Sequence, residues 1–105
     1  MSLQDADRNG HGTHCAGTVG SATYGVAKTS NLIAVKVLGD HGAGSSTDII
    51  SGLQFVHDSA EKSGNPSVAS MSLGGGAFTP IDDAVTAVRV ISRLLADASD
   101  GDFDT

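Results

Sequence analysis

The stretch that decides the fold of this chain is Gly10-His11-Gly12-Thr13-His14-Cys15-Ala16-Gly17. A histidine stands between two glycines, which leave its imidazole uncovered and allow other backbone to approach closely. Asn9 and Gly10 predict a turn, and the small residues after them predict a helix, so His11 is expected near a helix N-terminus. A histidine in that place is suited to act as a general base beside a cleft.

The rest of the chain alternates between predicted strands and helices. A further helix is predicted to be capped by Thr47 or Ser46 and to run to about Lys62, and another to run from Thr79 to about Ala96. Apolar runs predict buried strands at Asn31–Leu38 and Ser67–Leu73. The order helix, strand, helix, strand, helix is typical of a doubly wound α/β fold. Two strands alone do not make a stable parallel sheet, so the pattern indicates a slice of a larger one.

Length and charge limit what this chain can be. Its 105 residues fit one domain at most, and its formal net charge of −6 argues against nucleic acid as a partner. No stretch is apolar for long enough to span a membrane. No signal peptide is visible at the N-terminus, which fits a mature, trimmed or intracellular chain.

Cysteine and histidine usage gives no metal centre. Cys15 is the single cysteine, so an intrachain disulfide is impossible. It follows His11 by four residues, which predicts that the thiol lies under the imidazole on one helical face. His11 and His14 lack a third ligand, so a metal pair is not expected. His41 and His57 are expected to be solvated, and the aspartate-rich end of the chain to be disordered.

Four motifs in one order carry a family resemblance. They are Asp7–Gly20, Tyr24–Ala27, Val35–Leu38 and Ser70–Gly76. In this order they resemble the subtilisin-like serine proteases, or subtilases, in the proteinase K-like form found in fungi. The resemblance runs over residues 7–88, so residues 1–105 are interpreted as part of a subtilase catalytic domain. Residues 89–105 are interpreted as a divergent helix and acidic tail.

The resemblance implies roles for particular residues. His11 is implied to be the triad histidine, which takes the proton of a serine hydroxyl and returns it to the leaving amine. Two extended edges are implied to pair with substrate backbone, one at Gly42, Ala43 and Gly44 and the other at Ser72, Leu73, Gly74 and Gly75. Members of the family can hold structural calcium, but none of those sites maps onto this sequence, and no cofactor is expected.

The sequence departs from the family pattern in three places. The triad aspartate is expected well upstream of His11, and Asp5 and Asp7 are too close to it. The family's Gly-Thr-Ser-Met-Ala nucleophile segment is missing. After Val88 the family has another apolar strand, whereas this sequence predicts a continued helix and an acidic tail.

Two functional hypotheses follow. In the first, the chain is a segment of a secreted serine endopeptidase that cleaves peptide or protein substrates, and it is inactive on its own. In the second, it is a non-catalytic, truncated subtilase product that serves as a binding or antigenic module. In either case the open sheet edges favour self-association.

Overall fold

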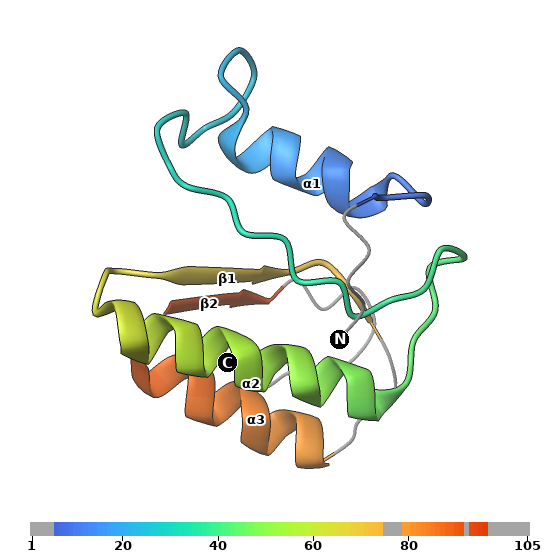
Figure 1. Ribbon diagram of the computed structural model, residues 1–105, viewed down its shortest axis with the longest axis vertical. Coiled ribbons are helices and arrows are strands. Elements are labelled where there is room, and N and C mark those ends of the chain that lie inside the picture. Colours follow the sequence, from blue (N-terminus) through green and yellow to red (C-terminus); the bar gives the residue numbers. More distant parts are fainter. Residues whose placement is uncertain (1–5, 75–78, 92, 97–105) are drawn as a thin grey trace.

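The computed structural model describes residues 6–74, 79–91 and 93–96. Within these ranges the elements follow the order α1, α2, β1, α3, β2. The helices are α1 (His11–Gly20), α2 (Ser46–Ser63) and α3 (Thr79–Ile91). The strands are β1 (Val68–Met71) and β2 (Arg93–Ala96). Figure 1 shows α1 on one side of the two strands and the α2–α3 pair on the other.

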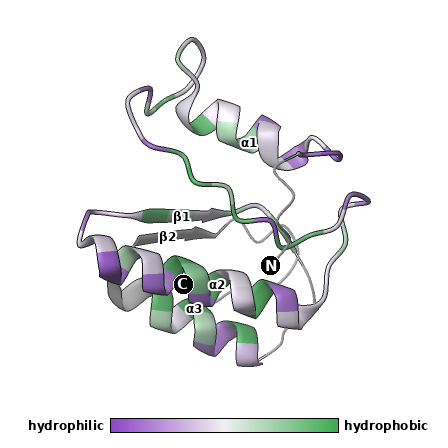
Figure 2. Cartoon of the chain, in the orientation of Figure 1, coloured by the Kyte–Doolittle hydropathy of each residue, from purple (hydrophilic) through white to green (hydrophobic). Residues whose placement is uncertain are grey.

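The core lies where α2 packs against α3. Both helices are amphipathic, and Figure 2 shows apolar stretches on each of them. Val88 is the most deeply buried of the large side chains, at 1% exposure. It packs with a cluster of buried apolar residues from the two helices, namely Leu53, Ile81 and Val85. Among the described helices, none has both the length and the hydropathy that a membrane crossing requires.

The ends of α2 follow from its sequence. The helix is capped by the hydroxyl of Ser45, which accepts a hydrogen bond from the backbone N–H of Asp48. It ends at Ser63 and is followed by the C-cap Gly64, whose φ of 67° lies in the left-handed region that glycine adopts without strain. The predicted helix is confirmed, with its cap one residue before Ser46.

The two strands form a parallel pair. Val68 is in register with Arg93, and Met71 with Ala96. Helix α3 is the connection between them, as in a βαβ unit. The strand predicted at Ser67–Leu73 is therefore confirmed in its central part. The continued helix predicted to about Ala96 is wrong, because α3 ends at Ile91 and a strand follows. Leu94, Leu95 and Ala96 are strong helix formers, and pairing with β1 overrides that local preference.

The strand predicted at Asn31–Leu38 is not formed in the described part of the chain. Residues 31–37 have no regular secondary structure, and no sheet partner binds them there. Leu32 is 50% exposed and Ile33 is 73% exposed, while Val35 and Val37 are half-buried beside α2. An apolar run predicts burial, but only a ladder of hydrogen bonds makes it a strand. The observed order is thus helix, helix, strand, helix, strand, and the α/β class holds while the full doubly wound sheet is not seen.

Gly52 allows segment 31–38 to lie against α2. A Cβ atom at this buried position would overlap Cγ1 of Val37. We expect Gly52→Ala to lower the free energy of unfolding by about 1–3 kcal/mol, because overpacking forces the neighbouring segment to move. Gly17→Ala is the matched control, since it also lies in a helix but has open space around it. It should stabilise α1 by roughly 0.5–1 kcal/mol. Urea denaturation measures both, and equal effects would contradict the packing role of Gly52.

Candidate functional site

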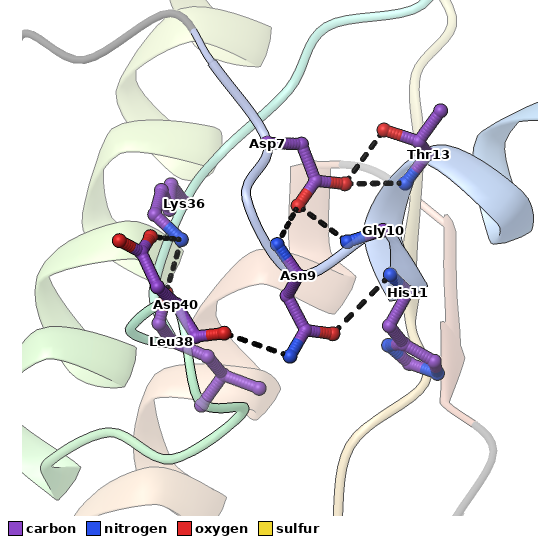
Figure 3. Close-up of polar contacts among 8 residues, drawn as sticks. All are labelled: Asp7, Asn9, Gly10, His11, Thr13, Lys36, Leu38 and Asp40. Atoms are coloured by element: carbon purple, nitrogen blue, oxygen red, sulfur yellow. Dashed lines mark hydrogen bonds and ion pairs between the residues drawn. The ribbon is translucent and has the colours of Figure 1, made fainter.

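The carboxylate of Asp7 holds the turn that leads into α1 (Figure 3). Its Oδ1 accepts hydrogen bonds from the backbone N–H groups of Asn9 at 3.0 Å and Gly10 at 2.8 Å. Its Oδ2 accepts from Thr13, at 3.0 Å from the backbone N–H and 2.6 Å from the hydroxyl. The N-cap residue Gly10 has no side chain to cap the helix, so Asp7 supplies the acceptor that the first turn needs. Gly10 itself has a left-handed φ of 94°, a conformation that glycine adopts without strain.

These hydrogen bonds lower the pKa of Asp7 well below its usual range. The largest cause is the backbone N–H of Gly10, followed by the hydroxyl and the backbone N–H of Thr13. The carboxylate is exposed, so the shift comes from the donors that favour the charged form.

The lowered pKa predicts how α1 responds to acid. Because the folded-state pKa of Asp7 lies below its unfolded value of about 3.9, its contribution to stability is fully present above that pH. The contribution is lost as the pH falls through the folded-state pKa. An NMR titration that follows the Thr13 amide should therefore show a transition below the ordinary aspartate range. Asp7→Asn should abolish that transition. A midpoint at or above the ordinary pKa of aspartate would show that these hydrogen bonds do not stabilise the Asp7 carboxylate.

His11 is the first residue of α1, and its side chain is exposed. Its backbone N–H donates to Oδ1 of Asn9 at 3.3 Å. Its Nε2 lies 3.7 Å from Sγ of the half-buried Cys15, one helical turn later. The prediction that the thiol shares a face with the imidazole is confirmed. Helix geometry thus leaves the imidazole exposed, with the Cys15 thiol beside its Nε2.

The loop at residues 39–44 lies next to the histidine turn. It is closed by hydrogen bonds from the N–H of Gly39 to the carbonyl of Ala43 at 2.8 Å and from the N–H of Gly42 to the carbonyl of Gly39 at 2.9 Å. Nδ2 of Asn9 donates to the carbonyl of Asp40 at 2.9 Å, which ties this loop to the histidine turn (Figure 3). Gly42, Ala43 and Gly44 are all exposed, as an edge that pairs with another chain must be.

The second predicted edge follows the end of β1. Ser72 and Gly74 are exposed and Leu73 is half-buried. Gly75 lies outside the described residues. Across the described residues, no hydrogen bond joins Ser72, Leu73 or Gly74 to His11 or to the 39–44 loop. Among the described residues, hydrogen bonds through the side chain of Asn9 therefore join the backbone of His11 to the 39–44 loop. None joins either of them to the segment after β1.

The other histidines lie outside this arrangement. His14 and His41 are exposed. His57 is partly solvated, since its side chain is 25% exposed, and its Nδ1 lies 3.2 Å from Oδ1 of Asp58 and 3.9 Å from Oε2 of Glu61. Gln54 donates to the same Asp58 oxygen at 2.8 Å. The hydrogen bonds from His57 and Gln54 lower the pKa of Asp58. The sequence analysis missed this cluster. The four-residue spacing of His57 and Glu61 on a predicted helix could have indicated it.

Comparison with known proteins places this arrangement in a family. The model of the subtilase family matches residues 3–101. The chain belongs to the subtilase family. This subtilase chain is 53% identical over 89 residues to the subtilisin-like serine protease Rho m 2.0101 of Rhodotorula mucilaginosa, a match that covers 80% of the chain and 26% of that protein. It is 46% identical over 104 residues to a cuticle-degrading protease of Metarhizium anisopliae, covering 97% of the chain and 27% of that protein.

A solved structure supports the same assignment. A cold-adapted subtilisin-like serine proteinase superimposes on this subtilase chain with a TM-score of 0.81 and 44% sequence identity. The match covers 90% of the chain and 34% of that structure. The chain spans about a quarter of the length of the curated relatives that it matches. Its α/β architecture is therefore that of part of a subtilase fold.

Proposed function

We propose that this chain is a segment of the catalytic domain of a secreted serine endopeptidase, with His11 as its general base. The observation that carries the proposal is an exposed imidazole on the first residue of α1, whose backbone N–H is joined through Asn9 to the 39–44 loop. Family membership supports the reaction class, since the relatives are named as proteases. A protease that degrades cuticle works outside the cell that makes it, which supports an extracellular location.

His11 would act in the way a triad histidine does. The neutral imidazole accepts the proton of a serine hydroxyl as that oxygen attacks the scissile carbonyl, then donates it to the leaving amine. The serine and the triad aspartate would come from segments beyond these residues. Asp7 does not fill the aspartate role, because its two oxygens are already occupied by four donors of the α1 turn. The triad mechanism requires no cofactor.

Substrate would lie between two extended edges. Gly42, Ala43 and Gly44 form one edge, and Ser72, Leu73, Gly74 and Gly75 form the other. Backbone pairing along such edges supplies affinity for a peptide or protein chain, and side-chain pockets supply specificity. Residues 31–38 have no sheet partner in this chain. In the whole domain they would pair with a neighbouring strand and so complete a doubly wound parallel sheet. In the isolated chain, the same unpaired segment and strand edges favour self-association.

A chimera tests the proposal. Residues 7–88 of this chain replace the aligned segment of the Metarhizium protease, so that the remaining catalytic groups come from that relative. We expect the chimera to cleave a chromogenic peptide amide and to be inhibited by a serine-directed phosphonate. A folded chimera without phosphonate-sensitive turnover would overturn the proposed function.

A further inference from the structure

The side chain of Asn9 connects two segments that are far apart in the sequence. Its Oδ1 accepts the backbone N–H of His11 at 3.3 Å, and its Nδ2 donates to the carbonyl of Asp40 at 2.9 Å. An N–H is only a donor and a carbonyl only an acceptor, so the partners fix which end of the amide faces which segment. A single planar group thus sets the spacing between the histidine turn and the loop that begins at residue 39 (Figure 3).

The loop is held together by its own hydrogen bonds. The bonds from Gly39 to Ala43 and from Gly42 to Gly39 close residues 39–43 on themselves. Lys36 braces the same region, because its Nζ donates to the Leu38 carbonyl at 2.7 Å and lies 3.6 Å from Oδ1 of Asp40. A Cβ atom added at Gly42 would lie 3.6 Å from Nδ2 of Asn9, so this part of the loop lies beside the amide. Anchoring the Asp40 carbonyl therefore places Gly42, Ala43 and Gly44 relative to His11.

We propose that Asn9 is a positioning residue that holds the substrate-pairing edge at residues 42–44 in register with the imidazole of His11. The inference rests on the proposed function, because only a protease needs these two segments in register. In this role Asn9 touches no reacting atom. It acts by fixing the distance over which a peptide bond must be presented to the histidine, and small errors in that placement are costly to catalysis.

The variant Asn9→Asp distinguishes the hydrogen bond to the Asp40 carbonyl from the one that caps α1 at the His11 N–H. Asn9→Asp keeps an acceptor for the His11 N–H, as good N-terminal residues do, but it places an oxygen against the Asp40 carbonyl. Asn9→Ala removes both bonds. Asn65→Asp is the matched control, since Asn65 is exposed and its side chain forms no hydrogen bond with the described residues.

Amide hydrogen exchange in the isolated chain measures directly how far the hydrogen bond from Asn9 to Asp40 protects the 39–44 loop. In Asn9→Asp we expect exchange at Gly42 to rise about two- to tenfold, the loss typical of one hydrogen bond, while exchange at His14 in α1 stays unchanged. Asn9→Ala should raise exchange at both amides, and Asn65→Asp at neither. Unchanged exchange at Gly42 in Asn9→Asp would overturn the proposal.

The kinetics of the chimera provide a second test of the role of Asn9. This test still applies if the isolated variant does not fold. With active sites titrated by phosphonate, Asn9→Asp should lower kcat/KM per active site by about tenfold or more. A merely structural role would reduce the number of titratable sites and leave kcat and KM per site unchanged, which would overturn the proposal. An inactive chimera with Asn9 intact would instead count against the proposed function, and the exchange result would still stand.

Discussion

Replacing His11 by alanine in the chimera is expected to lower kcat by roughly a million-fold, with a much smaller change in KM. Triad members act as a unit, so removal of one costs about as much as removal of all. The histidine acts on the proton that moves in the transition state, and substrate binding along the two edges does not depend on it. Initial rates on a peptide amide, measured over a range of substrate concentrations, separate kcat from KM.

The control for this result is His57→Gln on α2. His57 is half-buried among Gln54, Asp58 and Glu61, and none of these residues belongs to the proposed site. The variant should keep kcat and KM within about twofold, because none of the residues that His57 contacts belongs to the proposed site. If His11→Ala retained more than about a hundredth of the activity, His11 would not be the general base.

The local parts of the site could be predicted from sequence because they depend on short spacings. The four-residue interval between His11 and Cys15 is one helical turn, so a helix through both brings Nε2 and Sγ together. The glycine before His11 signals a turn, which Gly10 confirms with a positive φ. The short distance in sequence from Asp7 to His11 also argued against Asp7 as the triad aspartate, and the four donors around its carboxylate show that it holds the turn before α1 instead.

The long-range parts could not be predicted, because they depend on which segments meet. Asn9 and Asp40 are 31 positions apart, and neither residue type predicts that they form a hydrogen bond. Residues 31–38 have the composition of a buried strand, but a strand also requires a partner, and the described chain provides none for it. Residues 93–96 read as helix by propensity and become a strand because β1 offers them an edge.

The isolated chain is expected to show no phosphonate-sensitive hydrolysis of a peptide ester or amide. Serine proteolysis needs a hydroxyl within hydrogen-bond reach of the general base, which in turn needs an acid to orient it. Ser70 and Ser72 stand in a stretch that superficially resembles the family's nucleophile segment. Within the described residues, neither forms a hydrogen bond with a histidine ring. With His11 alone, turnover should fall roughly a million-fold below that of the active chimera.

The experiment compares the isolated chain with its Ser70→Ala and Ser72→Ala variants, each with and without phosphonate. Background hydrolysis that is equal in all samples and insensitive to phosphonate supports the prediction. Turnover that phosphonate blocks and that disappears in either variant would show a working serine nucleophile within this chain. In that case β1 and the segment after it would lie closer to His11 than the hydrogen bonds of the described residues indicate, and the second edge would carry the nucleophile instead of pairing with substrate.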